Sequence, residues 1–352
     1  MIRAAYAPYK LRFIAPAVTS RSVMLHKDAF FLKVWDDECP DRFGVGECAL
    51  FRGLGADDRP GYEERVALLC REVNAGVPVS DLSAWGSVLF GWKTAVSDLA
   101  NGGRRIPFPS AFSAGEEEIP INGLVWMGTG QEMAGRIRDK LDAGFRCVKL
   151  KIGGIGFDSE LELLRDIRKR FSAESLELRL DANGAFSPAE ALARIDALSR
   201  FGIHSIEQPI RQGQYAEMAR ICRESPVDIA LDEELIGLTF TADKERMLDA
   251  IRPRYVILKP SLCGGFASAD EWIRLARDRG IGWWATSALE SNIGLNAIAQ
   301  WVSSYRPDMP QGLGTGMLYS NNVESPLRQE RDVLLSDTSG RWCMPQLEWI
   351  EP

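Results

Sequence analysis

The sequence contains only two histidines, His26 and His204, among its 352 residues. That shortage argues against a histidine-ligated zinc centre and against catalysis by a Ser-His-Asp triad. No apolar run approaches the roughly 18 residues that a membrane-spanning helix needs. The first residues, MIRAAYAPYKLRF, also lack the apolar stretch and cleavage site of a signal peptide. We therefore expect a cytoplasmic protein that has no membrane partner.

Charge and cysteine content narrow the class further. The net charge is −7 and the sequence shows no basic stripe, so nucleic acid is not expected as a partner. The 7 cysteines are odd in number, scattered and without CxxC spacing, which favours reduced thiols over disulfides. The apolar content of 45% is sufficient for a core, and the length predicts two domains.

The first part of the chain has the pattern of an α+β unit. Short alternating stretches before residue 34 are typical of antiparallel strands. Apolar residues at helical spacing follow over residues 61–100. Residues 102–119 are rich in Gly, Pro and charge and are interpreted as a linker. We predict a first domain over residues 1–110.

Beyond the linker, strand and helix patterns alternate. The alternation begins with a strand over 119–127 and a helix over 131–143, and it ends with a helix over 291–303 and a strand near Gly312. We count eight strands and seven intervening helices, which predicts a (β/α)7β barrel over residues 119–322. Residues 323–352 contain a strand-like stretch and are expected to return to the first domain, completing it as a cap.

Five charged residues end apolar, strand-like runs in this second part. They lie 30, 26, 25 and 27 residues apart, about the length of one strand, one helix and two loops. Catalytic groups of parallel barrels gather at the carboxyl ends of the strands. We therefore expect these five on one rim: Lys151 in CVKLKIGG, Asp181 in LELRLDANG, Glu207 in GIHSIEQPI, Asp232 in VDIALDEEL and Lys259 in RYVILKPSL.

The three acids of this series predict a metal site. Asp181, Glu207 and Asp232 would point from neighbouring strands into one mouth, where ionised carboxylates repel one another unless a cation lies between them. Oxygen ligands without His or Cys favour Mg²⁺, with Mn²⁺ as the alternative. Taken singly, each acid has an ordinary alternative, which is to cap the helix that follows.

The lysines predict acid–base chemistry beside that metal. The period of two in VKLK places Lys149 and Lys151 on the same inward face of a strand. Like charge from Lys149 and from the metal would make Lys151 a usable base near neutral pH. Lys259 would lie across the mouth and approach a substrate from the opposite face; its alternative is a salt bridge to one of the acids.

These motifs together resemble the enolase superfamily, in its muconate-lactonizing subgroup. The matching segments are KLK at 149–151, DAN at 181–183, EQP at 207–209, DE at 232–233 and KP at 259–260, and SALES at 287–291 resembles the subgroup's seventh-strand motif. The resemblance covers the whole chain. It implies a capping domain on a (β/α)7β barrel, and proton abstraction next to a carboxylate with Mg²⁺ stabilising the enediolate.

Within the subgroup, two features resemble the o-succinylbenzoate synthase family. Arg179 precedes Asp181 by two residues and matches an arginine that this family uses near the substrate. Gly312-Leu313-Gly314-Thr315-Gly316 resembles its glycine-rich eighth-strand turn, where backbone N–H groups meet a substrate carboxylate. A plain tight turn is the alternative for that cluster. The resemblance further implies substrate contacts from Asn183, Ser287, Gly314 and Thr315.

This likeness implies a lyase of menaquinone biosynthesis that acts on a small-molecule carboxylate. Lys151 would remove the α-proton of 2-succinyl-6-hydroxy-2,4-cyclohexadiene-1-carboxylate and protonate the leaving hydroxyl from the same face, giving o-succinylbenzoate. Lys259 would stabilise the ring by a cation–π contact. The loops 15–23 and 47–57, mostly apolar or small apart from Arg21 and Arg52, are expected to close over the substrate.

Three alternatives stay open. N-acylamino acid racemases use both lysines as bases, and this sequence is compatible with them. Dipeptide epimerases of the subgroup carry a DxD pair at the eighth strand, and residues 311–315 contain no acid, which counts against them. A non-catalytic binding barrel would be expected to have lost a ligand or a lysine, and none is missing. The oligomeric state cannot be inferred from the sequence.

Overall fold

The computed structural model describes residues 1–18 and 22–352. Arg21, expected in a loop over the substrate, lies outside the described residues. The chain begins with an antiparallel sheet of three strands in the order β1-β2-β3, on which two helices pack. We call this the N-terminal unit. Its elements are β1 (Ile2–Val18), β2 (Val23–Asp36), β3 (Cys39–Cys48), α1 (Tyr62–Asn74) and α2 (Gly86–Ala100).

The second part of the chain is a curled parallel sheet of seven strands in the order β11-β10-β9-β8-β7-β6-β5. Its strands are β5 (Gly123–Val125), β6 (Cys147–Lys151), β7 (Glu177–Asp181), β8 (Ser205–Glu207), β9 (Asp228–Leu231), β10 (Tyr255–Leu258) and β11 (Gly282–Ala285). In the described residues a helix follows each strand: α3 (Gly130–Asp142), α4 (Phe157–Arg168), α5 (Ala191–Ser199), α6 (Tyr215–Glu224), α7 (Thr241–Ile251), α8 (Gly265–Arg277) and α9 (Asn292–Ser303). The predicted alternation is confirmed.

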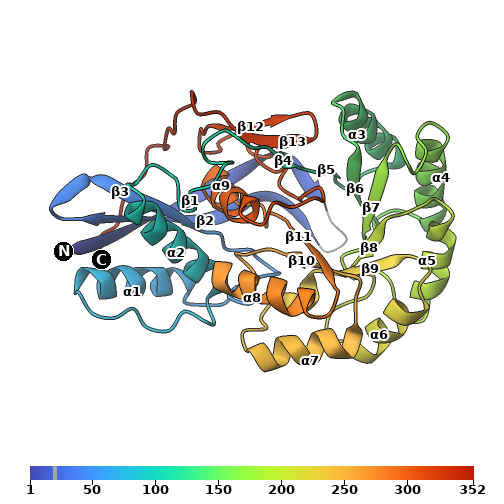
Figure 1. Ribbon diagram of the computed structural model, residues 1–352, viewed down its shortest axis with the longest axis horizontal. Helices are drawn as coiled ribbons and strands as arrows, with labels where there is room; N and C mark the ends of the chain where they lie inside the picture. The colour runs from blue at the N-terminus through green and yellow to red at the C-terminus, as the bar shows by residue number, and fades with distance from the viewer. Residues whose placement is uncertain (19–21) are drawn as a thin grey trace.

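The helices cover the outer side of the curled sheet, and α9 lies next to the N-terminal unit, where it contacts β3 (Figure 1). Strand β6 shows why the sequence folds this way. Val148 and Leu150 belong to the buried core that also contains Leu164 of α4. Since side chains alternate along a strand, Lys149 and Lys151 then face the inside of the curl. The predicted inward lysine pair therefore follows from apolar burial on the other face.

The two edges of the curled sheet meet at residues 311–312. Gln311 N donates to Pro120 O at 2.8 Å, next to the β5 edge, and Gly312 N donates to Ala285 O of β11 at 2.8 Å. The expected last strand near Gly312 is present as two parallel bridges, to Ile121 and to Thr286, rather than as a regular strand. The strand expected over 119–127 is divided into β4 (Ile119–Pro120) and β5.

The C-terminal residues run back beside the beginning of the chain. Strands β12 (Leu327–Glu330) and β13 (Val333–Ser336) form a small antiparallel sheet with β4. Tyr6 and Ile350 then exchange backbone hydrogen bonds of 3.0 and 2.8 Å. The strand-like stretch 343–350 forms only isolated bridges. The segment interpreted as a linker is not loose, because Phe112 within it is fully buried in the main core.

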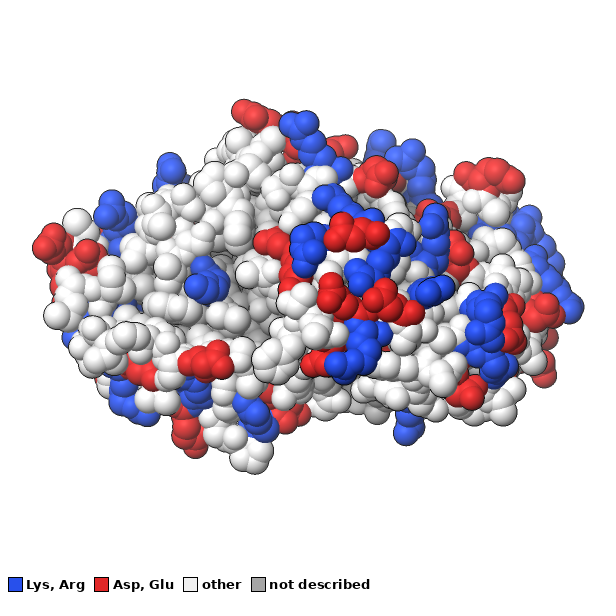
Figure 2. Space-filling model, turned by 60° about the horizontal axis from the view of Figure 1, so that its bottom comes forward, with Lys and Arg blue, Asp and Glu red and all other residues white. Residues whose placement is uncertain are grey.

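The surface carries charges of both signs, and the cysteines form no disulfides. Lys and Arg alternate with Asp and Glu over the face shown in Figure 2, and no continuous basic stripe crosses it. All seven cysteines are free thiols. Across residues 1–18 and 22–352, none of the helices has both the length and the apolar character that a bilayer crossing requires.

Close contact between β3 and α2 depends on glycine. A Cβ atom on Gly46 would lie 1.9 Å from the carbonyl oxygen of Gly91, and one on Gly44 would lie 1.9 Å from that of Ala95. Real Cβ atoms do not approach a backbone oxygen so closely, so any side chain at these positions pushes α2 away from the sheet. The N-terminal unit therefore owes its compact packing to small residues on β3.

We predict that Gly46→Ala lowers stability by about 1–3 kcal/mol, because overpacking forces the backbone apart. The matched control is Gly135→Ala within α3, where the nearest heavy atom to the new Cβ is Arg138 Nη2 at 3.9 Å. That substitution should raise stability by roughly 0.5–1 kcal/mol, because alanine is the better helix residue. Urea unfolding midpoints measure both. Equal midpoints for the two variants would contradict the packing argument.

Candidate active site

The ends of strands β6 to β10 bring three carboxylates and three lysines into one cluster. In the sheet register Lys151 is paired with Asp181, and Asp181 is paired with Glu207. Asp232 directly follows β9, and Lys259 directly follows β10. The five residues of the spaced series lie at or beside the carboxyl ends of their strands, and Lys149 lies two residues before the end of β6. The acids are at most 2% exposed, so this charge is almost entirely removed from water.

Each carboxylate is paired with a lysine. Lys151 Nζ lies 2.6 Å from Asp181 Oδ2, and Lys149 Nζ lies 2.9 Å from the same oxygen. Lys149 also forms an ion pair with Glu207, and Lys259 forms one with Asp232. The cluster therefore places three acids against three lysines. A buried charge without a partner would cost several kcal/mol, so the lysines are as necessary to the acids as the acids are to the lysines.

Burial and neighbouring charges shift the pKa values of these groups in different directions. Burial alone would raise the pKa of Asp181, but Lys149 and Lys151 hold it well below its usual value. Burial, together with the nearby charges of Asp181 and Asp232, raises the pKa of Glu207. Burial opposes the charge of Lys149 and of Lys259, yet the neighbouring carboxylates outweigh it and raise both pKa values. Lys149 and Lys259 are therefore held as ammonium ions at neutral pH.

The donor set fits a hard divalent cation. It consists only of carboxylate oxygens, which Mg²⁺ prefers. One of them, Glu207 Oε1, is buried without a hydrogen-bond partner, which is costly unless another group binds it. As the side chains are placed, the described residues contain no group of three or more His, Cys, Asp or Glu arranged to hold a metal ion. Each of the three acids is instead within ion-pair distance of a lysine.

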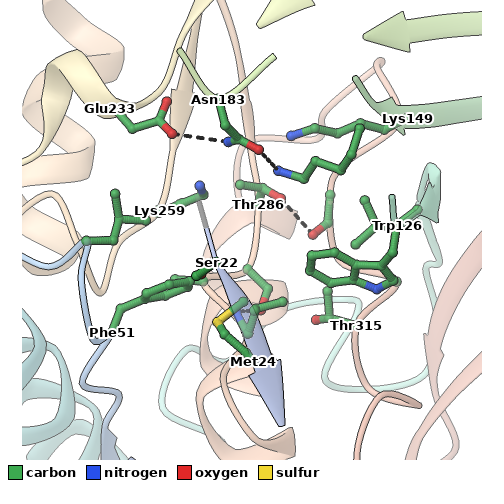
Figure 3. Close-up of a pocket in the computed structure, with 18 of the residues that line it drawn as sticks. Ser22, Met24, Phe51, Trp126, Lys149, Asn183, Glu233, Lys259, Thr286 and Thr315 are labelled. Atoms are coloured by element: carbon green, nitrogen blue, oxygen red, sulfur yellow. Dashed lines mark hydrogen bonds between the residues drawn. The ribbon is translucent and has the colours of Figure 1, made fainter. Parts of the chain in front are cut away.

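Asn183 connects the two sides of the cluster. Its Oδ1 accepts a hydrogen bond from Lys151 Nζ at 2.8 Å, and its Nδ2 donates to Glu233 Oε1 at 3.1 Å. Figure 3 shows this chain of contacts along one wall of the cavity, with Lys149 and Lys259 on opposite sides. Asn183 was expected as a substrate contact. In the structure it also orients Lys151 through the hydrogen bond to Nζ. The only sequence signal for Glu233 was its position next to Asp232.

A cavity opens above the lysines. Of the expected residues, Lys149, Lys151, Asn183, Lys259, Ser287, Gly314 and Thr315 line it. Phe51, Arg52, Gly53 and Leu54 from the loop after β3 line it too, as expected for a loop that covers the substrate, and Ser22 does so from the other loop. Sequence reasoning missed Met24, Asn122, Leu124, Trp126 and Thr286. Gly312 belongs to the expected glycine-rich turn, and Glu233, Ala288 and Leu289 lie within quoted motifs but were not expected to line the cavity.

Two polar atoms in the cavity wall have no hydrogen-bond partner. They are Oγ1 of Thr315 and Oδ1 of Asn122, on residues that are 4% and 3% exposed. Buried polar groups in native proteins are nearly always satisfied, so these two oxygens lack a partner that would usually be present. Phe51, Met24 and Trp126 form an apolar wall across the cavity from the lysines, and Thr315 lies beside Trp126 (Figure 3). The cavity therefore suits a molecule with an apolar ring and anionic ends.

Arg179 does not reach the cavity. Its Nε donates to Glu177 Oε1 at 2.7 Å, its Nη1 donates to Pro310 O at 2.8 Å, and its guanidinium lies 4.4 Å from the ring centroid of Trp284. The side chain thus points toward Glu177 at the beginning of β7, away from the strand end that carries Asp181. The structure does not bring Arg179 together with the other expected substrate contacts.

Three of the seven non-glycine residues with positive φ in the described part of the chain lie at the strand ends. Asn183, Gln208 and Leu289 have positive φ angles of 47°, 41° and 64° although none is glycine. Such conformations cost of order 1–3 kcal/mol each and persist where surrounding contacts enforce them. Asn183 follows β7, Gln208 follows β8 and Leu289 lies in the loop after β11. This cluster of strain marks the same rim as the charges.

Comparison with known proteins gives consistent results. The family model described as enolase C-terminal domain-like matches residues 132–337. An o-succinylbenzoate synthase of Desulfotalea psychrophila (strain LSv54 / DSM 12343) is 47% identical, covering 94% of this chain and 97% of that protein. The crystal structure of MenC from Desulfotalea psychrophila LSv54 superimposes with a TM-score of 0.85 at 44% identity, covering 95% of this chain and 99% of that one.

A dipeptide epimerase from Cytophaga hutchinsonii, solved with Mg and the dipeptide D-Ala-L-Val, has a TM-score of 0.80 over 99% of both chains but is only 20% identical. That likeness shows the fold alone. The family match and the 47% identical relative show that the chain belongs to the enolase superfamily. Within it, the similarity to an o-succinylbenzoate synthase runs over almost the full length of both proteins.

Proposed function

We propose that this protein is an o-succinylbenzoate synthase, which dehydrates 2-succinyl-6-hydroxy-2,4-cyclohexadiene-1-carboxylate in menaquinone biosynthesis. The observation that carries the proposal is the 47% identity to such an enzyme over 94% of the chain. The site supports it, because lysines on opposite sides of the cavity face an apolar wall above buried carboxylates. Its partner would be this small-molecule carboxylate, and the cytoplasm stays the predicted location.

We infer that the curled sheet, closed through residues 311–312, is the (β/α)7β barrel expected from the sequence. The hydrogen bonds from 311–312 to both sheet edges support this. The N-terminal unit would be its cap, with domain limits at 1–110, 119–322 and 323–352. The loop after β3, which lines the cavity through Phe51 and Leu54, supports the capping role.

Asp181, Glu207 and Asp232 would hold the metal, Mg²⁺ or alternatively Mn²⁺. When bound, such a cation neutralises negative charge on a substrate carboxylate during proton removal. The ring carboxylate of the substrate would enter beside these acids, next to Lys149. Because its pKa is raised by the acids, Lys149 stays charged and adds to the attraction for an anion.

Lys151, as the neutral amine, would remove the α-proton of the substrate. Asn183 Oδ1 and Asp181 fix the direction of its Nζ, which keeps the amine pointed at one place in the cavity. After taking the proton, Lys151 would donate it to the leaving hydroxyl from the same face, so that water departs and the ring becomes aromatic. Lys259, held as an ammonium ion by Asp232, would face the electron-rich ring in a cation–π contact.

The distal carboxylate of the succinyl group needs donors at the other end of the cavity. Thr315 Oγ1 is buried without a partner, and Gly314 and Ser287 line the same cavity. These residues, with Asn183, are proposed as substrate contacts. Phe51, Met24 and Trp126 would enclose the ring, since aromatic and thioether surfaces exclude water from it. Water exclusion strengthens the electrostatic interactions of the lysines.

N-acylamino acid racemisation is the second candidate, because Lys151 and Lys259 both reach the cavity and would serve opposite faces of a substrate. A dipeptide epimerase fits less well, since residues 311–315 offer no acid for an ammonium group. The deciding assay uses purified protein with Mg²⁺ and the cyclohexadiene, followed by the loss of diene absorbance, with racemisation of N-acylamino acids run in parallel. Diene turnover supports the proposal; racemisation without dehydration refutes it.

We predict that Asp232→Asn weakens Mg²⁺ binding by at least about tenfold, since even changes beside the ligands of a metal commonly cost that much. Isothermal titration calorimetry on the protein alone measures this, and chelation by EDTA should stop diene turnover. The matched control is Asp228→Asn at the exposed beginning of the same strand. Unaltered affinity in Asp232→Asn would exclude the assignment and move attention to Glu233 or Glu234.

We also predict that Lys151→Ala lowers dehydration by roughly 10²–10⁴-fold or more, the contribution typical of a general base. It should also stop exchange of the α-proton of a bound substrate analogue with deuterated solvent. Lys259→Ala should slow dehydration but retain that exchange. Lys169→Ala, an exposed lysine on α4's C-terminal side, is the control. If instead each lysine variant keeps exchange for one enantiomer of an N-acylamino acid, both lysines act as bases and the pure dehydratase assignment fails.

A further inference from the structure

A second set of buried charges lies between the N-terminal unit and the loop after β11. Lys27 on β2, Glu47 on β3 and Glu290 beyond β11 are 6%, 0% and 0% exposed. None of the three is among the residues that line the cavity, and none takes part in the chemistry described above. Burying three charges is costly, so their contacts need an explanation beyond surface pairing.

Glu290 joins two segments of the cavity wall. Its Oε1 accepts a hydrogen bond from Ser261 Oγ at 2.5 Å, and its Oε2 accepts one from Ser287 Oγ at 2.6 Å. Ser261 is two residues beyond Lys259 and is fully buried. Ser287 lines the cavity. One carboxylate therefore ties the turn that carries Lys259 to the loop after β11.

Glu47 attaches the N-terminal unit to the same loop. It accepts hydrogen bonds from Ser291 N at 2.9 Å, Ser291 Oγ at 2.6 Å and Gly294 N at 3.0 Å, all at the beginning of α9. A carboxylate at a helix N-terminus is stabilised by the unpaired N–H groups and the helix dipole. Gly294 leaves room for it, since a Cβ there would lie 3.0 Å from Glu47 Oε2 and 2.6 Å from Glu290 Cβ.

Lys27 completes the set from β2. Its Nζ donates to the carbonyl oxygen of Ala288 at 2.5 Å, between Ser287 and Leu289 of the cavity wall. Burial lowers the pKa of Lys27, and the charges of Glu290 and Glu47 oppose that effect. The charge of Asp57 also opposes that effect, and its Oδ2 accepts hydrogen bonds from Ser87 N and Oγ at the beginning of α2.

We propose that Glu290 is a positioning residue for Lys259, held in place by Glu47 and Lys27 from the N-terminal unit. By bonding Ser261 and Ser287 at once, it sets the turn after β10 relative to the loop after β11, and with them the ammonium group of Lys259 relative to the substrate. This role rests on the proposed function. It explains why the N-terminal unit contributes buried charges to a loop rather than to the substrate itself.

The test uses Ser261→Ala in the full-length protein, because Ser261 contacts Glu290 but does not line the cavity. Removing one hydrogen bond to a charged acceptor and loosening the turn should lower kcat for diene dehydration about tenfold while KM stays within about twofold. The control is Ser303→Ala, another buried serine whose Oγ donates only to Gln300 O within α9. It should leave kcat and KM unchanged, with a similar small change in Tm.

Glu290→Gln provides the second variant and a double-mutant cycle. If Ser261 acts through Glu290, the double variant loses no more kcat than Glu290→Gln alone. Losses that multiply would overturn the proposal, as would wild-type kcat in Ser261→Ala. If the two residues act only on stability, both single variants lower Tm but leave kcat unchanged, and the proposal is overturned.

Amide hydrogen exchange followed by mass spectrometry separates this proposal from the proposed function. In Ser261→Ala, exchange should accelerate in peptides over both 259–265 and 285–291, although these segments are far apart in sequence; in Ser303→Ala it should not. If the unaltered protein fails to dehydrate the diene, the proposed function is refuted, and the exchange data still decide whether Ser261 and Glu290 tie the two segments. Unchanged exchange at 285–291 overturns the tie.

Discussion

The site depends on a balance of buried charge. Lys149, Lys151 and Lys259 face Asp181, Glu207 and Asp232 where water is nearly absent, and neither set would be tolerable alone. This balance explains the pKa pattern, in which Asp181 is held low and Lys149 and Lys259 are held charged. The charged residues face the inside of the curl because the apolar residues of the strands pack against the helices on its outer face.

The order of the strands places the lysines on different sides of the cavity. Lys149 and Lys151 come from β6, and Lys259 follows β10, four positions away in the sheet order. A ligand in the cavity therefore meets lysines from different directions, while the acids beneath it stand on the strands between. Asn183 and Glu233 add a polar connection along one wall, and the strained backbone at Asn183, Gln208 and Leu289 shows that the rim is held in shape by its surroundings.

Much of this arrangement could be predicted from the sequence, because it follows from strict local rules. The period of two in VKLK placed both lysines on one face, and the regular spacing of five strand ends placed their side chains on one rim. Residues without such a rule were missed. Trp126 and Asn122 lie next to a short strand that the sequence pattern merged into a longer one. Arg179 is two residues from Asp181, as the strand period requires for residues on one face. Its long side chain nevertheless turns back to Glu177, and residue spacing does not predict that orientation.

The contribution of the N-terminal unit is the part that sequence patterns reveal least. Lys27, Glu47 and Glu290 are separated by more than 200 residues at their extremes and have no motif in common, and only the fold brings them together. The central claim is that Asp181, Glu207 and Asp232 form a metal site between the lysines. A crystal structure of the protein grown with Mg²⁺ and o-succinylbenzoate tests it most directly. The account predicts one ion about 2.1 Å from oxygens of Asp181, Glu207 and Asp232, with Lys151 and Lys259 on opposite faces of the bound ring; an ion held elsewhere, or a ring with both lysines on one face, would contradict it.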